Sequence, residues 1–164
     1  RLNGAAASDR YYPFSSVELF LSSENTLMIN APLVCDDTLQ TNDIARIYPD
    51  GSFTILGRKD NVINSGGIKV QAEEIERLLQ SSIPVPFVIT SVPDRRLGQA
   101  VTLLIEGQME ISALGTKLES VLASYYRPKY IYTVNHIPQT GNGKINRKEC
   151  RVLAESLQLL GRQE

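Results

Sequence analysis

The chain has no tryptophan, one histidine and two cysteines among its 164 residues, and these scarcities argue against several kinds of site. A single imidazole, His136, is too few for a histidine-rich zinc site, and we expect it to be structural. Cys35 and Cys150 fall in unrelated contexts without metal-ligand spacing, so we expect free thiols in a reducing cytoplasm. The sequence therefore predicts no metal centre formed by its own residues.

Long runs of one charge sign are also lacking. Seventeen basic and eighteen acidic residues give a net charge of −1, which offers no reason to expect nucleic acid or an anionic membrane as the main partner. We find no secretory signal and no apolar run long enough to span a bilayer. With 42% hydrophobic and 21% charged residues, the composition is typical of a soluble globular protein.

The first part of the chain is predicted to be β-rich. Residues 16–21 and 26–30 flank a polar turn and predict one hairpin. Residues 44–48 and 53–56 flank Pro49-Asp50-Gly51 and predict a second. The composition changes near Asp60, so we expect a β segment over residues 1–59 and a separate unit over residues 60–164.

The second unit is predicted to be a compact α+β domain with a central, mainly three-stranded sheet packed by helices. Apolar spacing predicts helices over residues 71–80, 111–124 and 147–159, and strands over residues 85–91, 100–105 and 130–134.

Residues 138–147, which read PQTGNGKINR, place Lys144 on a loop with two glycines. A compact ammonium on a long flexible arm suits a phosphate or a carboxylate. The loop is not a Walker-type phosphate loop, because Pro138 stands where a glycine is needed and Ile145 where a Ser or Thr is needed. A solvated surface lysine explains the local pattern equally well. Arg147 adds a second positive charge nearby.

Two further candidate sites lie upstream. In residues 57–67, which read GRKDNVINSGG, Arg58 could donate to ribose or phosphate oxygens, and Ser65-Gly66-Gly67 permits close approach by a narrow ligand. Asp43 could accept two hydroxyl hydrogen bonds from a ribose. Each has a plainer alternative, a turn before a helix and a turn-capping aspartate, and local sequence alone favours the plainer one.

Taken in order, these segments resemble the C-terminal region of adenylate-forming, AMP-binding enzymes, the superfamily of acyl-CoA synthetases, peptide-synthetase adenylation domains and luciferases. The resemblance runs from about Leu39 onward, and residues 1–38 look like the last strands of the large N-terminal domain. Residues 64–76 look most like those of bacterial o-succinylbenzoate–CoA ligases of menaquinone synthesis. The strings that carry the resemblance are TND at 41–43, Gly51, GRKD at 57–60, SGG at 65–67, EIE at 74–76, Asp94, GQAV at 98–101, RPK at 127–129 and residues 138–147.

Members of the superfamily activate a carboxylic acid with ATP and Mg²⁺ to an acyl-adenylate, and most then transfer the acyl group to a thiol, commonly that of CoA. Their C-terminal unit is a mobile lid that rotates between the two half-reactions. By position, the resemblance assigns ATP binding to Asp43 and Arg58, the hinge to Asp60, the pantetheine tunnel to Ser65, Gly66 and Gly67, and the adenylation lysine to Lys144, which would bridge carboxylate and α-phosphate oxygens.

The match has departures and gaps. Asn42 and Ala72 stand where glycine and proline are frequent, but no charged group is lost. The superfamily's phosphate loop, acyl pocket and magnesium-holding pair should precede Arg1, so we expect a fragment that is inactive without its N-terminal domain. A cytoplasmic location is implied.

Two alternatives remain open. The chain could come from the adenylation domain of a peptide synthetase, although no carrier domain follows in the sequence. It could instead be a non-catalytic α+β interaction domain, in which Lys144 and the glycines are incidental surface residues.

Overall fold

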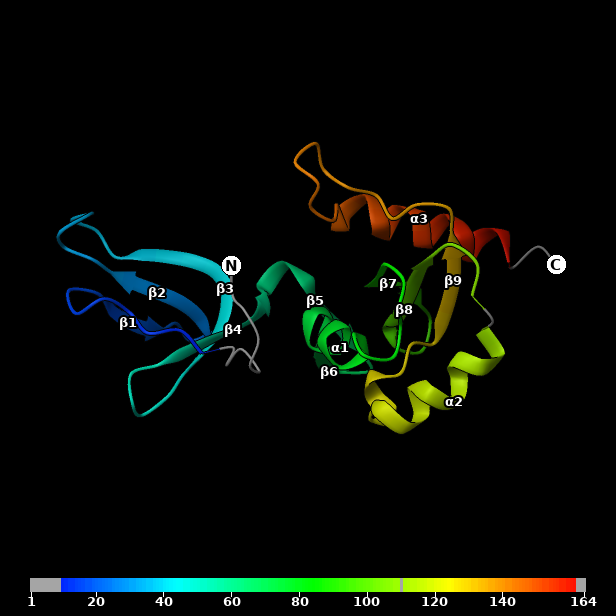
Figure 1. Cartoon of the computed structure of the whole chain (residues 1–164), viewed down its shortest axis with the longest axis horizontal. Helices are drawn as coiled ribbons and strands as arrows, with labels where there is room; N and C mark the ends of the chain where they lie inside the picture. Colours follow the sequence, from blue (N-terminus) through cyan, green and yellow to red (C-terminus); the bar gives the residue numbers. More distant parts are fainter. Residues whose placement is uncertain (1–9, 110, 162–164) are drawn as a thin grey trace. The chain divides into compact units, whose positions relative to one another are not determined.

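The structure, a computed structural model, describes residues 10–109 and 111–161. The chain divides into two compact units, Arg1–Asp60 and Asn61–Glu164 (Figure 1). None of the helices in this described part combines the length and apolarity needed to cross a membrane.

The first unit contains an antiparallel sheet in the order β1-β2-β3-β4. Both predicted hairpins are present, and β3 begins five residues earlier than residue 44. In the β3–β4 turn, the Asp50 carboxylate accepts hydrogen bonds from the Ser52 amide at 3.0 Å and the Ser52 hydroxyl at 2.6 Å, and Gly51 adopts a φ of +79° that suits glycine. The strands are β1 (Glu18–Leu21), β2 (Thr26–Asn30), β3 (Leu39–Ile47) and β4 (Phe53–Arg58).

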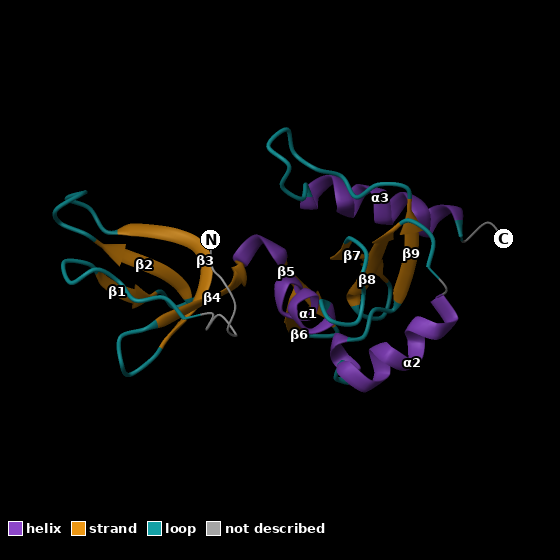
Figure 2. Cartoon of the chain, viewed as in Figure 1, coloured by secondary structure: helices purple, strands orange, loops and turns teal. Residues whose placement is uncertain are grey.

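The second unit is a mixed sheet covered by helices, which confirms the predicted α+β class (Figure 2). The sheet has the order β6-β5-β8-β7, and β9 pairs in parallel with β8. The three predicted strands are therefore extended by the β5–β6 hairpin, which was not predicted. The short 3₁₀ turn η1 (Lys59–Asn61) includes the last residues of the first unit and the first residue of the second. The other elements of the second unit are β5 (Val62–Ser65), β6 (Ile68–Gln71), α1 (Ala72–Leu79), β7 (Phe87–Asp94), β8 (Gly98–Glu106), α2 (Ile111–Val121), η2 (Ser124–Tyr126), β9 (Tyr130–Val134) and α3 (Arg147–Leu160).

The alternating side chains of β7 and β8 divide the core into two layers. On one face, Ile89 and Leu103 pack with Ile75 of α1 and Leu114 of α2. On the other face, residues such as Val88 pack with the helix α3. Figure 1 shows α3 and α2 on opposite sides of the sheet. Burial of both strand faces explains why β7 and β8 read as nearly continuous apolar runs.

Helix boundaries follow local chemistry. Glu73 and Glu74 lie in the first turn of α1, where carboxylates complement the helix dipole. The Asn146 side chain caps α3 by accepting the Glu149 amide at 3.3 Å. The helix α2 ends at Val121, short of the predicted Ser124, and Ser124 instead begins the short turn η2.

Candidate functional site

The loop that carries Lys144 is a small, internally bonded hairpin between β9 and α3. Gln139 and Ile145 form an antiparallel bridge at its base. At the tip, the Thr140 amide donates to the Lys144 carbonyl at 2.7 Å and the Gly143 amide donates to the Thr140 carbonyl at 2.9 Å. The Lys144 backbone is therefore held in place, although the residue is exposed.

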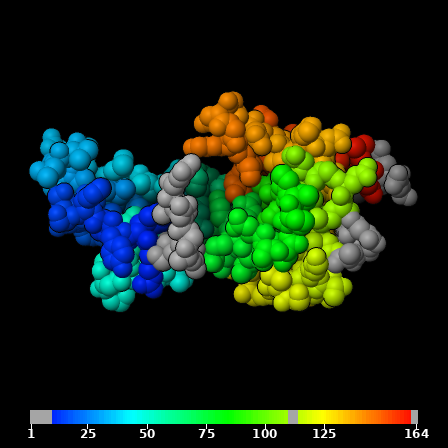
Figure 3. Space-filling model, in the orientation of Figure 1, coloured from blue at the N-terminus to red at the C-terminus, as the bar shows by residue number. Residues whose placement is uncertain are grey.

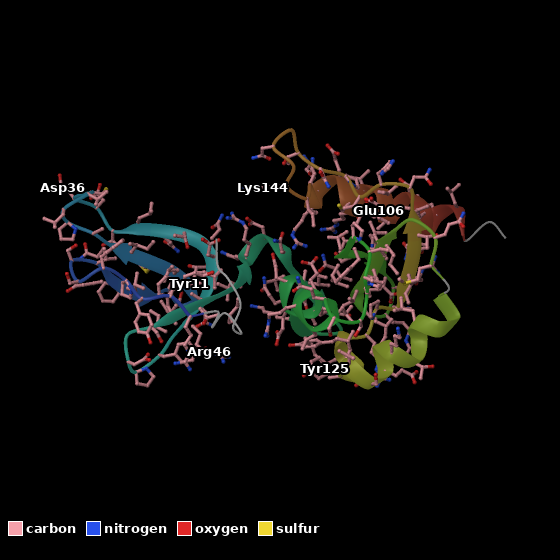
Figure 4. The ribbon with its side chains drawn as sticks, in the orientation of Figure 1. Tyr11, Asp36, Arg46, Glu106, Tyr125 and Lys144 are labelled. Atoms are coloured by element: carbon pink, nitrogen blue, oxygen red, sulfur yellow. The ribbon has the colours of Figure 1, made fainter. Side chains whose placement is uncertain are left out.

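The Lys144 side chain is available for a ligand. Figure 4 places it on the loop before α3, and Figure 3 shows this loop at the surface of the second unit. In the described part of the chain, its ammonium has no hydrogen-bond or ion-pair partner. A fixed backbone that presents a free cation suits an anionic group such as a phosphate or carboxylate.

Arg147 has a different role from the one its position suggested. Its guanidinium binds the Glu76 carboxylate in two places, at 2.9 Å and 2.7 Å, and lies 3.6 Å from Glu73. Glu76 also accepts the Ile89 amide at 2.9 Å. Burial disfavours the charged guanidinium, but the bond to Glu76 outweighs it and raises the pKa of Arg147. Arg147 is thus neutralised by Glu76 and joins the start of α3 to α1 and β7.

In the first unit, the structure brings together three of the predicted site residues. Asp43 and Arg58 are opposite each other in the β3–β4 ladder. The Arg58 guanidinium lies 3.3 Å from an oxygen of Asp43 and 3.3 Å from an oxygen of Asp60. The carboxylate of Asp43 is only about one-third exposed (35%) and is already oriented by the guanidinium. Carboxylate and guanidinium together suit the hydroxyls of a ribose.

Asp60 lies at the last position of the first unit, within η1. A short 3₁₀ turn between two compact units is a reasonable place for a backbone hinge. The hinge assignment, like the other site assignments, stays a prediction.

The predicted pantetheine residues form a tight turn between β5 and β6. Ser65 pairs with Ile68, so Gly66 and Gly67 are the two loop residues. Their φ values are +61° and +84°, which match the two-residue turn that favours glycine at both positions. The glycine pair therefore has a local structural reason as well as the proposed functional one.

A further ion pair supports the neighbouring β7–β8 turn. The buried Asp94 carboxylate binds the Lys129 ammonium at 2.5 Å and accepts the amides of Arg96 and Leu97 at 3.0 Å each. The bond from Lys129 lowers the pKa of Asp94 to about 2, and the two amides act in the same direction. Both residues belong to the strings that carry the family resemblance, but their pairing was not predicted.

The remaining candidates from the sequence are His136 and the two cysteines. His136 is exposed, with its Nδ1 atom 3.8 Å from a Glu106 oxygen. Cys35 and Cys150 are free thiols, and burial raises the pKa of Cys150 to about 11. Among the described residues, no three His, Cys, Asp or Glu side chains cluster as metal ligands would.

The site residues thus fall into three groups: the Asp43–Arg58–Asp60 cluster, the Gly66–Gly67 turn and the Lys144 loop. The latter two belong to the second unit, where no hydrogen bond or ion pair among described residues joins them. An open groove of about 330 Å³ lies beside the base of the Lys144 loop, lined mainly by apolar residues including Ile83, Phe87 and Ile145. Its lining carries no charged side chain, so it does not suit a phosphate.

Comparison with known proteins finds several similar proteins, although no family model matches the chain. Triostin synthetase I of Streptomyces triostinicus is 38% identical over 126 residues, 74% of this chain and 24% of the relative. A mitochondrial acyl-coenzyme A synthetase of Mus musculus is 31% identical over 152 residues, 87% of this chain and 26% of the relative. A 2-succinylbenzoate–CoA ligase of Lactococcus lactis is 33% identical over 113 residues, 68% of this chain and 25% of the relative.

The fold is shared with a solved structure, the o-succinylbenzoate CoA synthetase of Bacillus subtilis in complex with its acyl-adenylate intermediate. The TM-score is 0.72 with 19% sequence identity, and the match covers 84% of this chain and 34% of that one. The chain therefore spans about a quarter to a third of the length of these proteins.

These matches define the class: the chain is homologous to the C-terminal region of the adenylate-forming, AMP-binding ligases. Within this class, the relatives include CoA ligases and a peptide synthetase, and their similarity to this chain does not separate the two groups.

Proposed function

We propose that the chain is the C-terminal lid of an ATP-dependent acid–CoA ligase, which forms an acyl-adenylate and then a thioester with CoA. In this proposal the β unit, residues 1–59, is the end of a larger N-terminal domain, and residues 60–164 are the lid. The N-terminal domain would supply the acyl pocket and the magnesium site, so the chain alone would be inactive. A cytoplasmic location, where ATP and CoA are available, belongs to the same proposal.

The observation that carries the proposal is the free ammonium of Lys144 on a loop with a fixed backbone. Negative charge shifts between the carboxylate and the α-phosphate oxygens during adenylation. A cation that a fixed backbone presents at that place would stabilise this charge in the transition state. Removal of one such contact costs about 3 kcal/mol, or about 100-fold in rate.

The other groups would serve the nucleotide and the thiol. Asp43, oriented by Arg58, would accept the ribose hydroxyls of ATP. Rotation at Asp60 would then replace Lys144 at the reaction centre by the Gly66–Gly67 turn. A turn without side chains leaves room for the narrow pantetheine arm of CoA.

The experiment is Lys144→Ala in the full-length protein, with Lys148→Ala as the matched control because Lys148 is exposed and lies on the first turn of α3. We expect adenylate formation, followed by pyrophosphate exchange, to fall about 100-fold for Lys144→Ala. Thioester formation from supplied acyl-adenylate should change less than about threefold, because Lys144 has then left the centre. Equal activity of both variants and the parent would favour a non-catalytic interaction domain.

The acid is proposed to be o-succinylbenzoate, as in menaquinone synthesis, on the similarity of residues 64–76 and of the Lactococcus lactis relative. Another acyl or aryl acid is the immediate alternative. The similarity to triostin synthetase I favours a second candidate, a peptide-synthetase adenylation domain. Assays with free CoA and with a pantetheine-bearing carrier protein as acceptors distinguish the two.

A further inference from the structure

The turn between β7 and β8 lies directly against the Gly66–Gly67 turn. The Gly66 amide donates to the Leu97 carbonyl at 2.9 Å. A Cβ atom on Gly66 would lie 3.2 Å from the Leu97 Cδ2 atom, closer than an ordinary contact. The next residue, Gly98, pairs with Ser65 in the sheet. Residues just before and at the start of β8 therefore touch the glycine turn through backbone and side chain.

Gln99 adds a third attachment. Its side-chain oxygen accepts the Asn64 amide at 2.8 Å. The ladder between β5 and β8 consists of a single residue pair, Ser65 with Gly98. Gln99 therefore supplies an acceptor where the backbone ladder has stopped, and it holds β5 at Asn64, two residues before Gly66.

The β7–β8 turn is itself held by hydrogen bonds to the Asp94 side chain. Asp94 accepts the amides of Arg96 and Leu97, at 3.0 Å each, and binds the Lys129 ammonium. The Lys129 amide in turn donates to the Val101 carbonyl of β8 at 2.8 Å. These contacts let the turn act as a support, because the amides of Arg96 and Leu97 are already hydrogen-bonded.

We propose that Gln99 is a positioning residue for the thiol-transfer half-reaction. Through Asn64, and together with Leu97, it keeps the Gly66–Gly67 turn in the shape that the thiol-bearing arm meets. The catalytic part of this inference rests on the proposed function; the structural part, that Gln99 orders the turn, does not.

The structural part is tested by amide hydrogen exchange in the 164-residue chain. Gln99→Met removes the acceptor and keeps the side-chain length, Gln99→Glu keeps an acceptor oxygen, and Gln108→Met is the same change at an exposed glutamine. We expect the Gly66 amide, which donates to Leu97 and not to Gln99, to exchange about fivefold faster in Gln99→Met only. An unchanged Gly66 exchange rate in Gln99→Met would overturn the inference.

The catalytic part is tested with the same variants in the full-length protein. We expect thioester formation from supplied acyl-adenylate to fall about fivefold for Gln99→Met, with adenylate formation within about twofold, and Gln99→Glu to restore the rate. Equal losses in both half-reactions, or no rescue by Gln99→Glu, would contradict a positioning role. Absence of both half-reactions in the parent would instead reject the proposed function, and the exchange result would still decide the structural part.

Discussion

The Lys144 loop and the Gly66–Gly67 turn belong to the same unit but obtain their shapes in different ways. The Lys144 loop has its own backbone hydrogen bonds, and its downstream end is fixed by the charged pair of Arg147 and Glu76. The glycine turn depends on two positive φ values and on contacts from the neighbouring hairpin. One loop presents a side chain and the other presents bare backbone. A side-chain site needs a fixed base with a free end, whereas a backbone site needs the absence of side chains.

The largest loss of stability that distinguishes the two loops is expected from Arg147→Ala, which removes the ion pair next to the Lys144 loop. Breaking a buried ion pair costs about 3–5 kcal/mol. Here the side chains of Arg147 and Glu76 keep 26% and 18% exposure, so we expect the free energy of unfolding of the second unit to fall by about 2 kcal/mol. Urea denaturation measures this loss.

The matched control for that prediction is Arg151→Ala. Arg151 lies on the same helix and pairs with Glu155 at 3.1 Å, but the pair is exposed. Its loss should cost less than about 0.5 kcal/mol. If the two variants lost similar free energies of unfolding, the pair of Arg147 with Glu76 would stabilise the unit no more than an exposed pair does.

A smaller effect is expected within the glycine turn. Alanine at a positive φ costs about 1 kcal/mol, so Gly67→Ala, whose Cβ would meet nothing within 4 Å, should lose about that amount. Gly66→Ala should lose more, about 1.5–2 kcal/mol, because of the Leu97 side chain. Thermal denaturation of the two variants measures the difference in stability. A larger loss for Gly67→Ala would contradict the close contact between a Cβ atom at residue 66 and the Leu97 side chain.

The corresponding pair of substitutions in the Lys144 loop should cost no more than Gly67→Ala. Gly143 has a φ of +76° with open space around it, whereas Gly141 has open space and no positive φ. We expect Gly143→Ala to cost about 1 kcal/mol and Gly141→Ala to change stability by less than about 0.5 kcal/mol. The same denaturation experiment measures both, and equal costs would show that backbone conformation is not the cause.

The last effect concerns Asp94 and appears as a pH dependence of stability that is confined to acid. Its pKa in the folded chain, about 2, is below the ordinary 3.8, chiefly because of the bond from Lys129. The stabilisation is therefore complete above about pH 5 and is lost as the pH falls toward 2. An acid titration of unfolding stability should be flatter for Asp94→Asn than for the parent between about pH 5 and 2. Parallel curves would contradict this assignment.

The sequence predicted most elements of the fold because their signals are local. Both early hairpins, the three helices and the strands β7, β8 and β9 follow from apolar spacing and turn residues. The β5–β6 hairpin was missed because Ser65-Gly66-Gly67 was interpreted as a ligand-binding loop or as a turn before a helix, and not as the turn of a hairpin. A Gly-Gly pair between two short apolar runs is itself a signal for a two-residue hairpin turn, and it could have identified these strands.

The supporting contacts of the site were less accessible to sequence reasoning. Glu76 and Arg147 are 71 residues apart, and Asn64 and Gln99 are 35 apart. Charge and amide chemistry show what such residues can bond to, but only the folded sheet decides which of them meet. The sequence therefore indicated two positive charges near residue 144, Lys144 and Arg147, and among the described residues Arg147 has an ionic partner whereas Lys144 has none.

The distance along the chain between Glu76 and Arg147 has a consequence for synthesis on the ribosome. Strands β5 and β6 and the turn at Gly66–Gly67 are synthesised well before the helix α3 emerges from the exit tunnel. The ion pair that anchors the Lys144 loop can form only when that helix has docked, so a nascent or proteolytically trimmed chain would possess the Gly66–Gly67 turn before it possessed an anchored Lys144 loop.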